Sequence, residues 1–328
     1  MKKTLLGLTT AAILSFSMAV QAAPIKLKFS HVVAENTPKG QMAIEFKKLV
    51  AERLKGKVEV EIYPNGQLFG DNKVLEALLL GDVQLASPSL SKFKKYTKKL
   101  QIFDLPFLFN DMAAAERFQQ SEAGQGLLKS VESKGLIGLG YMHNGMKQLS
   151  ASKPLHVPAD VKGLKFRIMS SDVLSAQFKA VGATPLKKPY SEVFTLLQTK
   201  AIDGQENTWS NIHSKKFYEV QDNITSSNHG LLDYMVVTSA EFWNGLDADV
   251  RTELKKALDE AVVLGNKVAA EKSLSDKQAI IDSKRTNVIE LSKEERQQWV
   301  DAMKPVWKEF EDVVGKDLLA AAIAANKE

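Results

Sequence analysis

Residues 249–284 constrain the fold most strongly, because apolar residues recur there at helical spacing and no proline interrupts them. At about 1.5 Å per residue such a helix is roughly 50 Å long, whereas a small domain measures only about 30 Å across. At about 100 to 200 residues per domain the length of the chain suggests two domains, and a helix this long must lie across both. The apolar positions of the stretch are Val250, Leu254, Leu258, Ala261, Gly265 and Val268.

The first 22 residues are typical of an export signal. Lys2 and Lys3 precede an apolar run over residues 5–20, and Val20-Gln21-Ala22 forms a small-residue cleavage site. A membrane anchor is the competing interpretation, but the run is shorter than the roughly 20 residues that a spanning helix needs. We predict cleavage after Ala22, which leaves 328 − 22 = 306 residues and a periplasmic protein.

Composition and motifs exclude several classes of function. The sequence contains no cysteine, which excludes thiol catalysis and cysteine-based zinc sites. Its formal net charge of +5 falls to +3 without the two signal lysines, too small an excess to predict nucleic-acid binding. Common motifs of hydrolases, zinc proteases and phosphate-binding loops do not occur. We therefore predict no enzyme activity and no cofactor, with a periplasmic hydrolase as the open alternative.

The first part of the mature chain alternates strands and helices. Strands are predicted at residues 25–29, 58–62 and 83–85, separated by a helix that Thr37 begins and a second that Asp71 begins. Such alternation predicts a parallel α/β sheet. Polar residues follow the strands and should meet at one rim, and these are His31, Gln67, Ser87 and Ser89.

The later part repeats the alternation after a helix predicted at residues 112–133 and a strand at residues 136–142. Asn144-Gly145 is a turn signal, and we place the first passage between domains near it. Residues 224–239 should return as a long extended segment. The predicted boundaries are 23–145 plus 233–272 for domain I, and 146–232 plus 273–328 for domain II.

Residues 163–211 contain one conspicuous cation, Arg167. It alternates with Phe166 and Ile168 in a short strand pattern, and Ser171 with Asp172 then begins a helix. The outgoing end of a strand in a parallel α/β sheet is where ligands bind. Because a guanidinium can grip a carboxylate through two parallel hydrogen bonds, Arg167 is a candidate anchor. An exposed arginine on a surface strand is the competing interpretation.

Several blocks in order resemble the solute-binding proteins of tripartite ATP-independent periplasmic (TRAP) transporters, in their DctP-type, C4-dicarboxylate branch. They are FSHVVAENTPKGQ, YPNGQLFGD, LEALLLGDVQLASPSLSKF, FDLPFLF, GLKFRI, SEVFTLLQT and AIDGQENTWSN. The resemblance implies an α/β, two-domain periplasmic-binding-protein fold, with a cleft between the domains and a long domain-spanning helix.

The resemblance also implies ligand-binding residues. Arg167 would hold the main carboxylate, with Asn207 and Lys147 as partners, and Lys147 stands where the sialic-acid branch has an arginine. Further candidates are His31, Ser87, Ser89, Trp209, Tyr234 and Lys92.

Each of these further candidates has a plainer alternative. His31 can cap a turn, and Ser87 and Ser89 can satisfy backbone groups around Pro88. Trp209 is better explained as a cleft wall. Lys92 also belongs to a basic cluster that a solvated surface would explain, with Lys94, Lys95, Lys98 and Lys99.

The resemblance implies a receptor that closes over a small organic dianion such as malate, succinate or fumarate, and we expect it to be a monomer. The closed receptor would deliver it to a TRAP membrane permease with a small and a large integral subunit. Two alternatives stay open: another small organic acid, such as a sugar acid or a 2-oxo acid, or a sensor that presents its ligand to a membrane histidine kinase.

Overall fold

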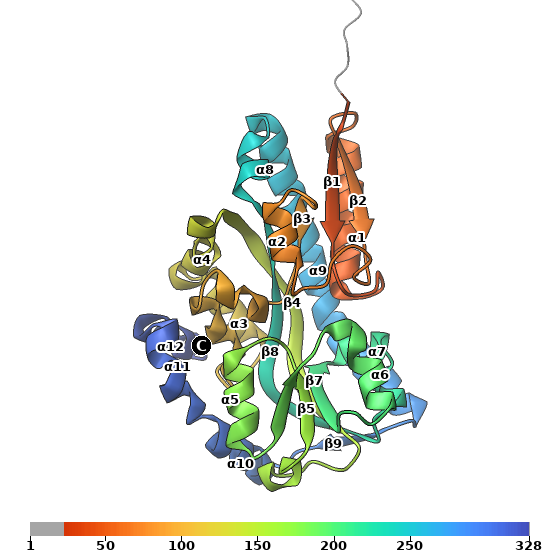
Figure 1. Ribbon diagram of the computed structural model, residues 1–328, viewed down its shortest axis with the longest axis vertical. Helices are drawn as coiled ribbons and strands as arrows, with labels where there is room; N and C mark the ends of the chain where they lie inside the picture. Colours follow the sequence, from red (N-terminus) through yellow and green to blue (C-terminus); the bar gives the residue numbers. More distant parts are fainter. Residues whose placement is uncertain (1–22, 328) are drawn as a thin grey trace, which may run out of the picture.

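The computed structural model describes residues 23–327, so the predicted export signal lies outside the described residues. A mixed nine-stranded sheet runs through the molecule in the order β2-β1-β3-β8-β4-β7-β5-β6, and β9 pairs with β8 (Figure 1). The strands are β1 (Ile25–Ser30), β2 (Val58–Tyr63), β3 (Leu85–Ala86), β4 (Leu136–Ala151), β5 (Lys165–Ile168), β6 (Thr184–Lys187), β7 (Gly204–Thr208), β8 (Asn223–Ser239) and β9 (Asn287–Glu290).

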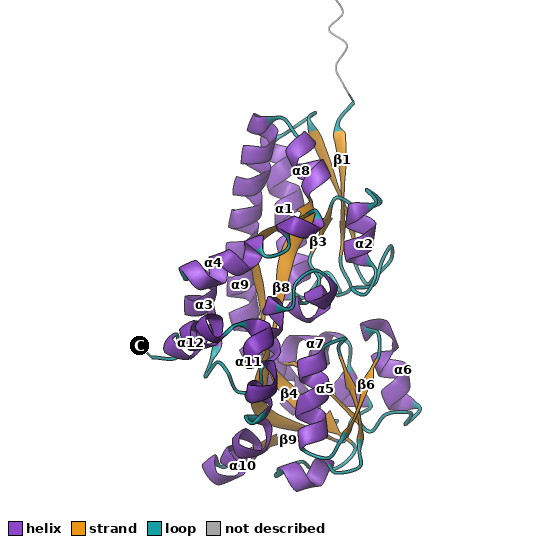
Figure 2. Cartoon of the chain, turned by 60° about the vertical axis from the view of Figure 1, so that its left-hand side comes forward, coloured by secondary structure: helices purple, strands orange, loops and turns teal. Residues whose placement is uncertain are grey.

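Helices cover both faces of this sheet (Figure 2). The α-helices are α1 (Pro38–Arg53), α2 (Val74–Leu79), α3 (Met112–Gln120), α4 (Glu122–Lys129), α5 (Asp172–Ala180), α6 (Val193–Gln198), α7 (Trp209–Ser214), α8 (Ala240–Gly245), α9 (Ala248–Ser283), α10 (Lys293–Met303), α11 (Val306–Val314) and α12 (Lys316–Ala324). Short 3₁₀ helices are η1 (Leu90–Lys95), η2 (Lys99–Asp104), η3 (Glu132–Lys134), η4 (Pro158–Val161), η5 (Tyr190–Glu192) and η6 (Phe217–Glu219). Among the described residues, no helix is both long and apolar enough to cross a membrane.

The predicted alternation at the start of the chain is confirmed. Strand β1 pairs in parallel with both β2 and β3, and α1 crosses between β1 and β2. Thr37 caps α1, since its side chain accepts a hydrogen bond from the Gly40 amide. Helix α2 begins only at Val74, so the helix start predicted at Asp71 was wrong by three residues.

Two long antiparallel strands, β4 and β8, connect the upper and lower parts of the molecule (Figure 1). The predicted turn at Asn144-Gly145 is wrong, because β4 continues through both residues. A shift in the strand register between His143 and Gly145 instead produces a bulge there, and Gly145 adopts φ 136°. Gly145 adopts a positive φ, as a glycine in a turn often does, but the chain does not reverse direction here.

Helix α9 confirms the predicted long helix and runs beside both parts of the molecule (Figure 1). It packs against α1 and β4 at one end and against α7 at the other. One continuous buried cluster joins Phe29 and Phe46 through Leu139 and Met142 of β4 to Phe166. The fold class that we predicted is confirmed, while the predicted domain boundaries stay a prediction.

The helix predicted at residues 112–133 is broken into α3, α4 and η3. Ser121 ends α3, and its hydroxyl then caps α4 by accepting a hydrogen bond from the Gly124 amide.

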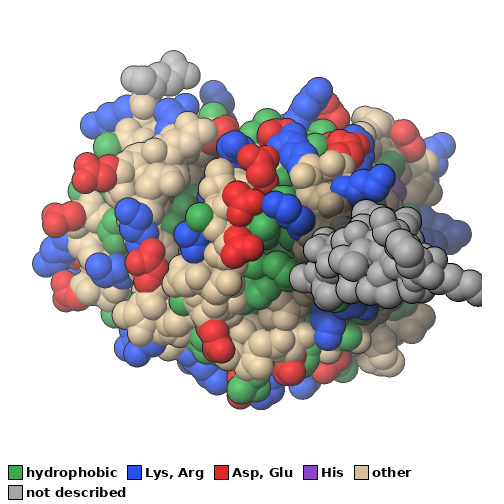
Figure 3. Space-filling model, turned by 90° about the horizontal axis from the view of Figure 1, so that it is seen from above, with side chains coloured by type: hydrophobic (Ala, Val, Ile, Leu, Met, Phe, Trp, Pro, Cys, Tyr) green, Lys and Arg blue, Asp and Glu red, His purple; other side chains and the backbone are tan. Residues whose placement is uncertain are grey.

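Viewed from above, basic and acidic side chains are interspersed over the face of the molecule that is seen (Figure 3).

Candidate functional site

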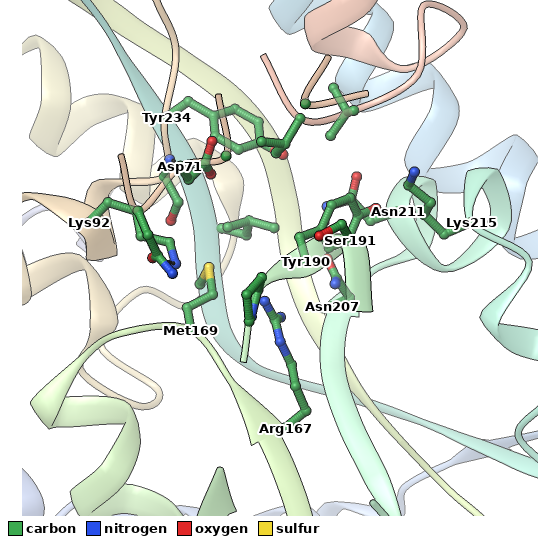
Figure 4. A pocket seen from close by; sticks show the side chains of 18 of the residues that line it. Asp71, Lys92, Arg167, Met169, Tyr190, Ser191, Asn207, Asn211, Lys215 and Tyr234 are labelled. Carbon is green, nitrogen blue, oxygen red and sulfur yellow. Dashed lines mark hydrogen bonds between the residues drawn. The ribbon is translucent and has the colours of Figure 1, made fainter. Parts of the chain in front are cut away.

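A cavity of about 420 Å³ lies where the loops after β1, β2 and β3 face the outgoing ends of β5 and β7 (Figure 4). Six of the nine predicted ligand-binding residues line it: Ser89, Lys92, Lys147, Arg167, Asn207 and Tyr234. They span residues 89 to 234. Parallel pairing of β5 and β7 places Arg167 near Asn207, as the sequence predicted, whereas Lys147 and Tyr234 come from the antiparallel strands β4 and β8.

Arg167 lies on β5 with its guanidinium at the cavity (Figure 4). The residue is only 2 % exposed, and its Nε donates to the Lys188 carbonyl at 3.0 Å. It forms no ion pair with any of the described residues. Burial lowers its pKa to about 10, although the negative charge of nearby Glu206 acts against this shift. A buried, unpaired guanidinium beside a cavity is suited to bind a carboxylate.

Asn207 follows on the neighbouring strand β7, and its orientation is fixed. Its side-chain oxygen accepts hydrogen bonds from the Asn211 Nδ2 at 2.8 Å and from the Thr208 amide at 3.2 Å. The Asn207 amino group is therefore left to donate toward the cavity, and its contact with a ligand carboxylate stays a prediction.

Lys147 is buried, and its Nζ lies 2.8 Å from Oε2 of Glu206, which is also buried. The same carboxylate oxygen lies 2.9 Å from His229 Nε2, and His229 Nδ1 lies 2.8 Å from Ser227 Oγ. Burial lowers the pKa of His229, so the neutral ring donates from Nε2 and accepts from Ser227. The charge of Lys147 is thus already used by Glu206, which sequence reasoning missed.

The order serine, histidine, glutamate in this network resembles a hydrolase triad, but the site cannot act as one. Ser227 is buried and does not line the cavity, so no substrate can reach its hydroxyl. Among the described residues, no group of three or more His, Cys, Asp or Glu side chains could hold a metal ion.

Lys92 faces the cavity, and its Nζ donates to Asn72 Oδ1 at 2.8 Å. Burial lowers the pKa of Lys92 to about 8. The solvated surface that we considered describes only Lys95, Lys98 and Lys99, which are exposed. Lys94 instead pairs with Asp172 at 2.9 Å.

Tyr234 is held between two polar groups on the returning strand β8. Its hydroxyl accepts from Asn144 Nδ2 at 2.8 Å, which leaves the hydroxyl proton free to donate. Lys39 Nζ lies 3.4 Å from the centroid of its ring. Ser89 forms an isolated antiparallel bridge with Tyr234, so the two predicted residues support one another at the cavity wall.

Three predicted residues do not line the cavity. His31 is buried edge-on to Phe29, and burial together with the nearby Lys39 lowers its pKa to about 3, so the ring is neutral. The Ser87 carbonyl accepts from Lys39 Nζ at 2.6 Å. Trp209 packs in a buried cluster with Ile212 and other apolar residues. This geometry gives their predicted ligand contact no support.

Several lining residues were not predicted. The four that matter most are Asp71, Tyr190, Glu206 and Asn211. Glu206 and Asn211 flank the predicted Asn207 closely in sequence, and this proximity is the signal that could have identified them. Asp71 and Tyr190 carry no comparable signal, because only the folded chain brings their loops to the cavity.

The comparisons with known proteins agree with this architecture. The family model for bacterial extracellular solute-binding proteins, family 7 (DctP), matches residues 29–312. The chain belongs to this family. It is therefore a periplasmic solute-binding protein of the TRAP type and not an enzyme, as predicted.

Individual DctP-family relatives are similar over almost the whole chain. The C4-dicarboxylate-binding periplasmic protein DctP of Shewanella loihica is 67 % identical over 317 residues, covering 97 % of this chain and 94 % of the relative. A TRAP solute-binding protein from Shewanella oneidensis with bound succinate is 68 % identical, with a TM-score of 0.92, covering 93 % and 100 % of the two chains. One from Pseudomonas aeruginosa with bound L-malate is 48 % identical, with a TM-score of 0.85 and coverage of 87 % and 100 %.

Proposed function

We propose that this protein captures a C4-dicarboxylate in the periplasm and that Arg167 with Asn207 holds one of its carboxylates. The observation that carries this proposal is the buried guanidinium of Arg167, which faces the cavity and has no ion-pair partner among the described residues. A buried charge is unfavourable unless it is paired, and an anionic ligand supplies the missing partner.

The second carboxylate needs another cationic group. Lys147 was one candidate, but its charge is compensated by Glu206 at 2.8 Å. Lys92 lies on the wall opposite Arg167 and makes no ion pair among the described residues (Figure 4). We therefore assign the second pole to Lys92, with the hydroxyl of Tyr234 as a further donor to the ligand.

The relatives support this ligand class, since similar proteins carry succinate or L-malate in their solved structures. Relatives that bind sugar acids are less similar to this chain: a protein with bound galactonate is 29 % identical and a 2,3-diketo-L-gulonate-binding protein is 31 % identical, against 68 % and 48 % for the proteins with succinate and L-malate. This difference favours a dicarboxylate over the sugar-acid and 2-oxo-acid alternatives. The proposal extends to closure of two domains with the predicted boundaries, 23–145 plus 233–272 and 146–232 plus 273–328, around the ligand. We further propose that the protein acts as a monomer and delivers the ligand to a TRAP permease with a small and a large subunit. A sensor kinase is the second partner to test.

A thermal-shift screen of organic acids tests the proposal. A ligand that binds only the folded protein stabilises it by about 2.7 kcal/mol at a hundredfold excess over Kd. We expect malate, succinate and fumarate to raise the melting temperature, and acetate and gluconate to leave it unchanged. A rise with gluconate alone would contradict the proposed ligand class.

A further inference from the structure

Asp71 is a carboxylate in the wall of a cavity that we assign to a dianion. It lies beside Tyr234 and Lys92, across the cavity from Arg167 (Figure 4). Its one hydrogen bond among the described residues is a long one, from the Ser89 amide to Oδ2 at 3.5 Å. It forms no ion pair with any of those residues. This long hydrogen bond does not by itself account for an acidic group in the cavity wall.

The charge of Asp71 has opposite effects on the site and on the ligand. Burial lowers the pKa of Lys92 to about 8 and that of Lys39 to about 8, and the negative charge of Asp71 acts against both shifts. Asp71 therefore helps Lys92 to stay protonated. The same negative charge repels any ligand carboxylate that approaches Lys92, so it weakens binding of a plain dianion.

This repulsion is offset when the ligand itself donates a hydrogen bond. An ionised carboxylate only accepts, and it accepts equally well from a hydroxyl or an ammonium group. A dicarboxylate between Arg167 and Lys92 carries such a donor only if a carbon between its two carboxylates is substituted. Succinate and fumarate have no donor at that position, whereas malate has a hydroxyl and aspartate an ammonium.

We propose that Asp71 is a specificity-determining residue, which accepts a hydrogen bond from a hydroxyl or ammonium group at C2 of the ligand. The site then prefers 2-hydroxy and 2-amino C4-dicarboxylates to their unsubstituted counterparts. This inference rests on the proposed function, because it requires a dicarboxylate between Arg167 and Lys92.

Isothermal titration calorimetry of the mature protein with L-malate, L-aspartate and succinate tests the inference. In the wild type, we expect L-malate to bind about tenfold or more tightly than succinate, the fold-change for one hydrogen bond to a charged group. In Asp71→Ala, the Kd for L-malate should rise at least tenfold while the Kd for succinate stays the same or falls. The two affinities should then converge.

Asp71→Asn provides a second variant of the same size. It keeps an acceptor oxygen but loses the charge, so L-aspartate should lose more affinity than L-malate. Glu76→Ala is the matched control, because it removes an exposed carboxylate from the adjacent helix α2, outside the cavity. We expect it to leave all three Kd values unchanged.

Equal losses for L-malate and succinate in Asp71→Ala would overturn the inference, and so would a wild type that binds succinate as tightly as L-malate. These outcomes leave the proposed function intact, since the wild type would still bind dicarboxylates. If the wild type binds none of the three ligands, the proposed function itself fails.

Discussion

Lys147 and Glu206 form an ion pair with 2.8 Å between Nζ and Oε2, and both side chains are only 1 % exposed. Lys147 comes from β4 and Glu206 from β7, so the pair ties a strand that joins the two parts of the molecule to the strand that carries Asn207. His229 adds a hydrogen bond from β8 to the same carboxylate oxygen. Three strands at the floor of the cavity are thus joined by one carboxylate.

Glu206→Gln should destabilise the protein strongly, because it leaves the Lys147 ammonium buried without a compensating charge. Removal of one partner from a buried ion pair typically lowers the free energy of unfolding by about 3 to 5 kcal/mol. Urea denaturation of the ligand-free protein measures this change. The control is Glu290→Gln, which removes an exposed carboxylate paired with Lys277 and should change the free energy of unfolding by less than about 1 kcal/mol.

Stability should also depend on pH through Glu206. Burial by itself raises the pKa of the Glu206 carboxyl, but Lys147 and His229 outweigh burial and lower the pKa from 4.5 to about 2. Since the folded pKa is below the unfolded one, Glu206 contributes stability above pH 4.5 that is lost as the pH falls toward 2. We expect the stability difference between wild type and Glu206→Gln to shrink over this range in urea titrations. A constant difference from pH 6 to pH 2.5 would contradict the assignment.

The elements that the sequence predicted best are those with a long, regular signal. The apolar spacing of α9 persists over its whole length, and the alternation around β1 and β2 contains its own helix cap at Thr37. The helix predicted at residues 112–133 failed because a serine can end one helix and begin the next without any change in apolar pattern. Ser121 does both.

The candidate site was predictable only in part. Arg167 and Asn207 lie near the outgoing ends of β5 and β7, and the parallel pairing of these strands places the two side chains on the same side of the cavity. The pairing of Lys147 with Glu206 depends on the register between β4 and β7, which places Lys147 opposite Thr208 and so diagonal to Glu206. A single sequence does not determine this register, because a shift by one residue would turn each side chain to the other face.

Asn72 links the two sides of the cavity opening. Its Oδ1 accepts hydrogen bonds from Lys92 Nζ at 2.8 Å and from Ser170 Oγ at 3.3 Å. Ser170 lies 98 residues after Asn72 in the sequence. Under the proposed domain closure this contact would form only in the closed protein. Asn72→Ala should therefore weaken dicarboxylate binding by about 2-fold to 12-fold, the range for one hydrogen bond. Stopped-flow measurements should show faster dissociation. Lys95→Ala, which removes an exposed lysine that does not line the cavity, should leave the dissociation rate within about twofold of the wild type.

Gly265 allows α9 to approach β4 and α1 closely. A Cβ atom at this position would lie 2.8 Å from Met142 Sδ and 2.8 Å from Met42 Cβ. Gly265→Val should therefore lower the free energy of unfolding by about 1 to 3 kcal/mol through overpacking. Gly126→Ala in α4 is the matched control, since a Cβ there meets nothing within 4 Å. Thermal unfolding should show that control unchanged or stabilised by up to about 1 kcal/mol.

Replacement of Arg167 should weaken ligand binding without lowering the stability of the ligand-free protein. Arg167→Ala should weaken dicarboxylate binding by about 2 to 5 kcal/mol, which is roughly 30-fold to several thousandfold in Kd. Arg167→Lys should also weaken it, because an ammonium cannot form two parallel hydrogen bonds to one carboxylate. Arg285→Ala, at an exposed position, is the control for calorimetry and should bind normally.

The ligand-free stability of Arg167→Ala separates a binding role from a structural one. Burial lowers the pKa of Arg167 to about 10, so the folded protein holds this charge at an energetic disadvantage. Its replacement should leave the melting temperature of the ligand-free protein unchanged or raise it, as at sites where stability is sacrificed for function. A large drop in that melting temperature, with dicarboxylate affinity preserved, would show that Arg167 supports the fold and that the ligand is bound elsewhere.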